Sequence, residues 1–309
     1  MNKPELLVTP KNVQDIVDLV SAGADAFLVG EEHFGLRLPG EFTREKIVEA
    51  TQLVHSYKKK LYVAVNAIFH NDRVGDLEDY LPFLEKTGVD GVVFGDPAVI
   101  MIAKAKAPSL KLHWSTETTG TNWYTCNYWG RKGAKRAVLA REINLDSVIE
   151  IKENAEVEIE VQIHGMSCMF QSKRMLIGNY YRYQEKNMKI ERQGMDESLY
   201  LYDEERDNRY PIFEDENGTH IMSPNDICMI DELEEFFEAG IDSLKIDGVL
   251  KSSEYILNVT SLYRKAIDLY YENPSLYEEQ KQDLYDQIEK LQPKNRSLDT
   301  GFYFKETVY

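Results

Sequence analysis

The residues between positions 160 and 168 combine the side chains best suited to chemistry. An apolar run over residues 157–163 predicts a buried strand, which ends at His164, with Cys168 close behind. A strand that ends by presenting histidine and cysteine on a loop places reactive groups where binding sites are usually found. Cys168 can be a nucleophile with His164 as its base, a ligand of a metal or cluster, or a small buried side chain. The residue types alone leave these three interpretations open.

Length and composition narrow the class of protein. The chain has 309 residues, 43% of them hydrophobic, so it can bury the core of one large domain or of two smaller ones. Acidic residues outnumber basic ones by 53 to 36, and the net charge of -17 works against wrapping a polyanion unaided. The sequence shows no apolar run near the roughly 20 residues of a membrane span, no apolar secretion signal and no disulfide framework among its three cysteines. We therefore expect a cytoplasmic protein with reduced thiols and no membrane contact.

A short pattern recurs along the chain and predicts its architecture. Each copy places a glycine at the end of an amphipathic segment, and a polar residue and a short apolar strand follow. The four copies occupy residues 22–30, 87–95, 133–140 and 239–247. Further strands are predicted at residues 5–9, 61–67, 111–115 and 157–163, which brings the total to eight. Most are separated by helical stretches such as 12–22, 44–58 and 76–86.

Eight strands that alternate with helices predict a parallel sheet in an α/β protein, and their number favours a closed (β/α)8 TIM-like barrel. A doubly wound open sheet is the structural alternative. We predict a barrel domain at residues 1–272, with a long insertion at 165–225 between strands seven and eight, and a short helical extension and tail at 273–309. The insertion contains an acidic stretch, 196–217, with nine acids and two arginines, and long insertions are usually functional or mobile. The tail is expected to dock on the body or on a partner.

In a (β/α)8 barrel the active site lies at the C-terminal ends of the strands, so the predicted fold selects candidate residues without any motif. A ring of carboxylates, amides and cations there suits a small polar or anionic ligand, and the Arg141 guanidinium can hold a carboxylate through two hydrogen bonds. For each residue alone, the alternative is a structural polar side chain at the rim. The catalytic candidates are Cys168, His164, Glu142 and Asp247, the ligand-binding candidates are Asn66, Asp96, Ser115, Arg141 and Lys245, and the remaining residues at strand ends are Thr9, Glu31, Glu32, His33, Thr116 and Glu117. We predict no metal site.

Well-known reaction motifs are absent, but several short segments carry a family resemblance. No Walker loop, HExxH or GxSxG pattern occurs in the sequence. The stretch 160–168 resembles the characteristic segment of the collagenase-like peptidases, peptidase family U32, in which a glutamate, hydrophobic residues, His-Gly, two residues and a cysteine follow one another. Other segments that resemble this family occur in order at residues 4–7, 22–26, 33–37, 139–142, 223–228 and 239–247. The resemblance spans nearly all of residues 4–270 and implies membership.

The resemblance implies more than the family name. Several relatives take part in oxygen-independent or prephenate-linked hydroxylation of RNA bases or quinones, and one branch makes 5-hydroxyuridine at the wobble position of tRNA. Such relatives hold an iron–sulfur cluster through four cysteines, of which Cys168 and Cys228 match here. Met175 and Met195 stand at or near the other two positions, and a thioether is a poor replacement for a thiolate on iron. We therefore expect this chain alone to bind no cluster or other cofactor, and Cys126 to be a buried apolar residue.

Three functions are compatible with the resemblance. The first, which we favour, is a component of prephenate-linked tRNA hydroxylation that forms a heteromer with a longer, cluster-bearing paralogue. Because this chain is acidic, that partner would supply the basic face for tRNA. The second is a peptidase that uses Cys168 or a metal, although no recognised triad is present. The third is a non-catalytic partner subunit with a degenerate barrel site, so whether the chain is catalytic by itself stays open.

Overall fold

Eight parallel strands close into a barrel, which confirms the predicted (β/α)8 architecture and excludes the open sheet. The computed structural model describes residues 2–115, 119–183 and 199–306. Strand β13 pairs with β1 on one side and with β7 on the other, and this pairing closes the sheet. The barrel strands are β1 (Glu5–Val8), β2 (Ala26–Val29), β3 (Lys60–Val65), β4 (Gly91–Phe94), β5 (Leu112–Ser115), β6 (Ala134–Val138), β7 (Glu158–Gly165) and β13 (Ser243–Ile246).

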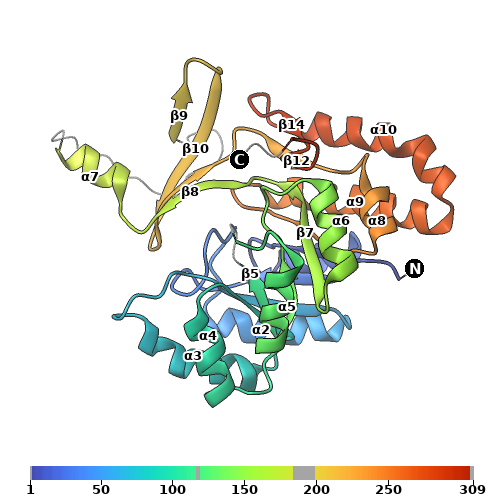
Figure 1. Cartoon of the computed structure of the whole chain (residues 1–309). Helices are drawn as coiled ribbons and strands as arrows, with labels where there is room; N and C mark the ends of the chain where they lie inside the picture. The colour runs from blue at the N-terminus through green and yellow to red at the C-terminus, as the bar shows by residue number, and fades with distance from the viewer. Residues whose placement is uncertain (1, 116–118, 184–198, 307–309) are drawn as a thin grey trace.

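Helices join consecutive strands and cover the outside of the barrel (Figure 1). The glycines of the recurring pattern, Gly23, Gly88, Gly133 and Gly240, all have positive φ angles between 72° and 114°. This left-handed conformation ends each helix at low cost only for glycine, so the predicted unit of helix, glycine and strand is confirmed. The helices of the barrel are α1 (Asp15–Ser21), α2 (Arg44–Ser56), the 3-10 turn η1 (Val74–Asp76), α3 (Leu77–Thr87), α4 (Pro97–Lys106), α5 (Trp123–Lys132), α6 (Leu145–Asn154), α8 (Leu233–Ala239) and α9 (Ser253–Glu272).

Successive side chains along each barrel strand point alternately to the outside of the barrel, under the helices, and to its inside. Outward-facing side chains pack under the helices in the main hydrophobic core, which also buries Cys126 of α5 as expected. The inside of the barrel is more polar, because the buried Arg136 forms ion pairs there with Glu5, Glu158 and Glu160. Although burial raises the pKa of Glu5, the charge and hydrogen bond of Arg136 outweigh it and lower that pKa to about 2. This network fills the N-terminal half of the barrel interior and leaves the C-terminal half for a site.

The insertion after β7 forms a second, four-stranded antiparallel sheet beside the barrel mouth (Figure 1). Its elements are β8 (Cys168–Ser172), α7 (Leu176–Tyr183), β9 (Leu199–Asp203), β10 (Asn208–Asp215) and β11 (Gly218–Met222). The buried Asn217 amide fastens this sheet to the barrel by donating to the carbonyl oxygens of Glu32 and Gly35 at 2.6 and 3.1 Å. The acidic stretch thus contributes β9 and β10 to an ordered sheet, while residues 196–198 lie outside the described part of the chain.

The C-terminal segment docks on the body of the barrel, which settles one of the two alternatives for the tail. Helix α10 (Pro274–Leu291) packs on α9, and β14 (Leu298–Asp299) pairs with β12 (Asp226–Cys228), itself an antiparallel neighbour of β7. The Tyr303 hydroxyl donates to the carbonyl oxygen of Gln162 at 2.7 Å, so the tail touches strand β7 directly. Within the described residues, no helix combines the length and apolar character needed to cross a membrane.

Candidate functional site

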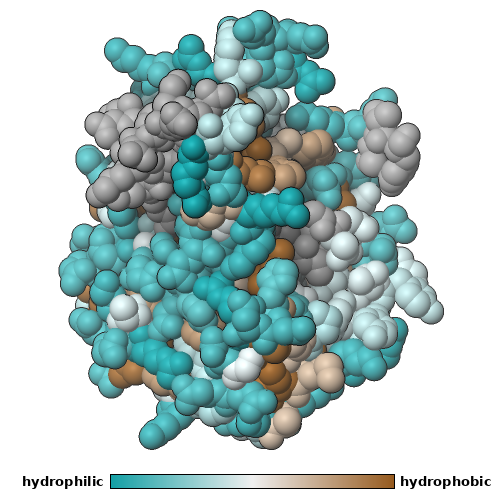
Figure 2. Space-filling model, turned by 90° about the vertical axis from the view of Figure 1, so that its left-hand side faces the viewer, coloured by the Kyte–Doolittle hydropathy of each residue, from teal (hydrophilic) through white to brown (hydrophobic). Residues whose placement is uncertain are grey.

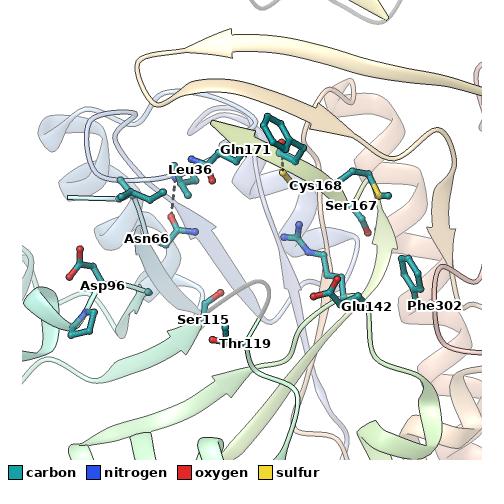
Figure 3. A pocket seen from close by; sticks show the side chains of 17 residues that line it. Leu36, Asn66, Asp96, Ser115, Thr119, Glu142, Ser167, Cys168, Gln171 and Phe302 are labelled. Carbon is teal, nitrogen blue, oxygen red and sulfur yellow. Dashed lines mark hydrogen bonds between the residues drawn. The ribbon is translucent and has the colours of Figure 1, made fainter. Parts of the chain in front are cut away.

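A pocket of about 600 Å³ opens at the C-terminal ends of the barrel strands (Figure 3). The ends of β3 to β6 form its floor and one wall, strand β8 of the insertion forms the opposite wall, and the tail closes one side with Phe302. The lining side chains are polar toward the barrel axis and mainly apolar toward the insertion. The residues that line it are Leu36, Asn66, Ala67, Ile68, Gly95, Asp96, Pro97, Ser115, Thr119, Arg141, Glu142, Ser167, Cys168, Met169, Phe170, Gln171 and Phe302.

A cationic corner lies beside the pocket, where Arg141 and Lys245 approach the Asp247 carboxylate. Lys245 lies 2.9 Å from the Asp247 carboxylate, and Arg141 lies 3.9 Å from the same oxygen. Burial raises the pKa of Asp247, but the charges of Lys245 and Arg141 outweigh it and lower the pKa below its usual value. One ionised carboxylate thus faces two cations, and the remaining positive charge favours an anion in the space above them.

A smaller cavity of about 30 Å³ lies at this corner and neighbours the mouth pocket, since Leu36, Asn66 and Arg141 line both. The small cavity also contacts Lys245, Asp247 and the buried Arg37. Arg37 donates to the side-chain oxygen of Gln171 at 3.1 Å and so ties the β8 wall to the barrel.

Neutral hydrogen-bonding groups line the wall beside the cations. Asn66 accepts from the backbone N–H of Leu36 at 2.9 Å, and this contact turns its amide nitrogen toward the middle of the pocket (Figure 3). Ser115 presents a nearly buried hydroxyl at the end of β5. Asp96 also lines the pocket, but one of its oxygens accepts from Ala98 N–H at 2.8 Å and caps helix α4. Asn66 and Ser115 can therefore orient a polar ligand, whereas Asp96 has a structural task as well.

We expected His164 to serve as a base for Cys168, but the structure places its ring away from the pocket. Its ring is fully buried and contacts the Tyr255 hydroxyl at 2.8 Å and the Tyr263 hydroxyl at 3.4 Å, both on helix α9 outside the barrel. The cause is a bulge in β7, because Lys245 pairs with Gln162 whereas Ile246 pairs with His164. The extra residue turns the histidine from the barrel interior toward the helices. Burial lowers the pKa of His164 to about 3, so the ring is neutral and structural.

Cys168 and Glu142 do line the pocket, in different settings. Cys168 begins strand β8 rather than lying on a loop, is half-buried, and its thiol lies 3.4 Å from the Phe170 carbonyl oxygen (Figure 3). Glu142 is exposed at the rim after β6. None of the six histidines of the chain lines the pocket, so Cys168 has no imidazole base there.

The residues that match family cluster ligands do not fit an iron–sulfur cluster in the described part of this chain. Cys228 is buried behind β7, where burial raises its pKa to about 12 and the Tyr263 hydroxyl lies 3.6 Å from its sulfur. Met175 is partly exposed just before α7, and Met195 lies outside the described residues. Among the residues described, no group of three or more histidine, cysteine or acidic side chains is arranged to hold a metal ion.

The remaining residues predicted at strand ends serve mainly as structural contacts. The Thr9 hydroxyl accepts from Gly248 N–H at 2.6 Å, and His33 lies between Asp76 and Arg73 at 2.9 and 2.8 Å. Glu31 is partly buried, and this burial raises its pKa. Glu32 supplies a carbonyl oxygen to Asn217, whereas residues 116 and 117 lie outside the described chain.

Sequence reasoning missed much of the pocket wall. Phe170 lies two residues after Cys168 on the same strand, so the alternation of β8 could have indicated it once that strand was recognised, whereas Gln171 falls on the opposite face in that pattern. Arg37 and Phe302 carry no comparable signal. Arg37 reaches the small neighbouring cavity from a loop after β2, and Phe302 reaches the pocket from the C-terminal tail, so only the folded chain brings them there.

Fold and site together define a (β/α)8 barrel protein with a polar pocket at the barrel mouth, a cationic corner beside that pocket, and an inserted sheet as one wall. The chain belongs to peptidase family U32, whose model matches residues 11–308. It is 67% identical over 309 residues to tRNA hydroxylation protein P2 of Bacillus subtilis (strain 168), covering the whole of both chains. It is 35% identical to tRNA hydroxylation protein P1 of the same bacterium, over 97% of this chain and 71% of that protein. The solved structure of a U32 peptidase shares the fold, with a TM-score of 0.50 and 15% identity over 80% of this chain and 92% of that one.

Proposed function

We propose that this chain is a component of tRNA hydroxylation, forming 5-hydroxyuridine at the wobble position together with a longer paralogue. The observation that carries the proposal is its 67% identity to tRNA hydroxylation protein P2 over the full length of both chains. The resemblance to protein P1, a longer protein of the same family, supports a paired arrangement.

In this proposal the mouth pocket binds a small carboxylate, such as prephenate, in the cationic corner. Arg141 and Lys245 hold the carboxylate by charge-assisted hydrogen bonds, and Asp247 keeps the Lys245 ammonium in place through its 2.9 Å contact. The amide of Asn66 and the hydroxyl of Ser115 orient the ligand's polar groups. Phe170 and Phe302 cover the outer part and exclude water from it.

A partner is required in this proposal for the redox chemistry. The thiol of Cys228 is buried beside Tyr263 with a raised pKa, and Met175 offers only a thioether, so this chain is suited to bind and position rather than to hold a cluster. We assign the cluster to the longer paralogue. Cys168 then contributes to the wall of the ligand pocket.

Peptidase chemistry finds less support in the same geometry. A cysteine nucleophile needs a base within hydrogen-bond reach, and His164, the nearest histidine in sequence, faces helix α9 instead. The purified chain should therefore leave gelatin intact, and cleavage that Cys168→Ser abolishes would favour the peptidase. A scaffold with a degenerate site would not need the Lys245–Asp247 pair, which lines the small cavity beside the pocket.

The test is the nucleoside content of tRNA. Deletion of the gene, alone and together with the gene of the longer paralogue, is expected to lower wobble 5-hydroxyuridine, measured by mass spectrometry of digested tRNA. Restoring the wild-type gene should return the modification, whereas a gene with Arg141→Ala and Lys245→Met should not. Unchanged 5-hydroxyuridine in the double deletion would refute the proposed function.

A further inference from the structure

The strand β8 and helix α7 form an arm whose charge differs from that of the rest of the molecule. Residues 168–183 contain three basic side chains and no acidic one, in a chain with 53 acids and a net charge of -17. The basic residues are Lys173, Arg174 and Arg182, and four aromatic residues, Phe170, Tyr180, Tyr181 and Tyr183, are interleaved with them. Basic side chains mixed with aromatic ones are typical of surfaces that bind single-stranded nucleic acid.

Several of these side chains are presented to solvent. Tyr183 is 85% exposed, Tyr180 is 59% exposed and Phe170 is 47% exposed, and Met175 and Leu176 are also exposed. Within the described part of the chain, the Arg182 guanidinium donates to the neutral groups Gly178 O and Asn179 Oδ1 of its own helix. Arg174 is exposed as well. Helix α7 lies at the left-hand side of Figure 1, the side that faces the viewer in Figure 2, where the surface is mainly hydrophilic and hydrophobic residues are scattered among hydrophilic ones.

Buried contacts hold the arm in a fixed orientation. The carboxylate of Glu214, on strand β10, accepts from the N–H groups of Ile177 and Gly178 at 2.8 and 3.1 Å, and so anchors the first turn of α7. The buried Thr219 hydroxyl accepts from Leu176 N–H at 2.9 Å. These contacts fasten the first turn of α7 to the inserted sheet.

Among the residues that the structure describes, the acidic side chains at the end of β10 and in the turn after it have other partners. Glu214 caps α7, Asp215 lies 2.9 Å from the buried His220 ring, and Glu216 lies 3.0 Å from Arg73. These carboxylates therefore do not neutralise the outer face of α7. The local excess of positive charge attracts an anion even though the whole molecule is negative.

The arm leads directly to the mouth pocket. Strand β8 lines the pocket with Cys168, Phe170 and Gln171, and the chain continues from there through Arg174 to α7, which lies beyond the barrel (Figures 1 and 3). Five strand residues and three link residues at roughly 3.3 Å each, with eight helical residues at about 1.5 Å each, give an arm of at most roughly 40 Å. Several nucleotides of a single strand fit along such a length.

We propose that this arm is an RNA-binding strip of the chain itself, which holds the single-stranded loop of a tRNA and directs one base toward the pocket. Arg174 and Arg182 contact phosphates, Tyr183 and Tyr180 stack on bases, and Phe170 contacts the base at the pocket mouth. The inference rests on the proposed function for the identity of the RNA, but the binding strip can be tested without it. It replaces the expectation that the partner alone supplies the basic face for tRNA.

The test measures RNA binding by the full-length chain. The probe is a fluorescent RNA hairpin with the anticodon arm of a tRNA and uridine at the wobble position, and the comparison is a fully paired duplex of equal length. Fluorescence anisotropy over a series of salt concentrations gives affinity and salt dependence. The arm variant is Arg174→Glu with Arg182→Glu, and the matched control is Lys265→Glu with Lys290→Glu, which changes the net charge equally on exposed positions of α9 and α10.

We expect the wild type to prefer the hairpin over the duplex. The arm variant should bind the hairpin at least about tenfold more weakly, with a salt slope reduced by about 1.4, since each lost phosphate contact removes about 0.7. Tyr183→Ala should weaken binding about fivefold or more and leave the salt slope unchanged, because stacking carries no charge. The control should bind as the wild type does, and thermal unfolding should show that all variants are folded.

Four results would overturn the proposal: no hairpin binding by the wild type, equal binding of the duplex, equal weakening by the control, or wild-type affinity in the arm variant. If the arm variant binds the hairpin normally but no longer co-purifies with the longer paralogue, the strip is a protein interface instead. The nucleoside assay separates the two proposals. Arm-dependent RNA binding with unchanged 5-hydroxyuridine in the deletion strains would refute the proposed function and leave the strip standing.

Discussion

Asp226 joins the barrel to the C-terminal segment through a buried cluster of charges. Its carboxylate accepts from Arg296 at 2.6 Å, from Gln292 at 3.0 Å, and from Lys251. Burial raises the pKa of Asp226, but the charges of Lys251 and Arg296 outweigh it and hold the pKa well below the usual range. Asp226 is therefore ionised in the folded chain, and we predict that Asp226→Asn destabilises the protein strongly.

The magnitude follows from what asparagine would place in the cluster. An amide nitrogen would replace one carboxylate oxygen and set a donor against the donors of Lys251 or Gln292, and both buried cations would lose their counter-ion. Breaking a buried ion pair by removing one partner costs about 3–5 kcal/mol. At about 2 °C for each kcal/mol in a chain of this size, the Tm should fall by about 6–10 °C.

Thermal unfolding followed by circular dichroism at neutral pH measures this loss. The matched control is Asp283→Asn on α10, where an exposed carboxylate accepts from Gln287 and the expected change is within about 0.5 kcal/mol. Adding Lys251→Met to Asp226→Asn should restore part of the stability, because it removes an uncompensated buried charge. A fall in Tm below about 2 °C for Asp226→Asn would refute the reasoning.

The pH dependence provides a second check on the same cluster. The folded-state pKa of Asp226 is lowered, so its stabilising contribution is present above the ordinary value of about 4 and is lost as the pH falls toward the folded-state value. The difference in unfolding free energy between wild type and Asp226→Asn should be constant from about pH 5 to pH 7 and shrink below about pH 4. A constant difference throughout the acid range would mean that the charge of Asp226 is not the cause.

Three further predictions concern the pocket, the cluster and the tail. Arg141→Ala should weaken prephenate binding by roughly 10–100-fold, because a charge-assisted hydrogen bond contributes about 1.5–3 kcal/mol. Calorimetry measures this affinity, and an unchanged value would place the anion elsewhere. The chain purified alone should contain no stoichiometric iron or sulfide by chemical analysis, and a brown protein with cluster absorbance would contradict our assignment for Met175 and Met195. Tyr303→Phe removes the hydrogen bond to Gln162 O and should lower the free energy of unfolding, measured in urea, by about 1 kcal/mol. An unchanged midpoint of urea unfolding would show that this bond does not stabilise the docked tail.

Much of the fold could be predicted because its signals are local. The glycines at 23, 88, 133 and 240 end helices through a backbone conformation that their own residue type permits, and short apolar strands follow each of them. Asn66, Ser115, Arg141, Lys245 and Asp247 could be selected for a related reason. Parallel strands of a barrel bring their C-terminal ends to one rim, so residues that are distant in sequence meet there once the strands are identified.

His164 shows where that reasoning stops. Alternation along β7 places Glu160 inside the barrel beside Arg136, and strict continuation would place His164 inside as well. The bulge opposite Lys245 and Ile246 shifts the register by one residue and turns the ring toward Tyr255. A bulge arises from the pairing of two strands, and neither strand shows it alone.

The sequence by itself determined the barrel, the family and most of the polar residues at the mouth, because periodicity, glycine positions and short motifs act over a few neighbouring residues. Only the tertiary structure decided which of those residues share a pocket. It carried Phe302 from the tail to the mouth, removed His164 from it, and set the basic arm of β8 and α7 apart from the acidic remainder of the molecule. These outcomes depend on long-range packing and register, whose free energy is shared among residues far apart in the chain.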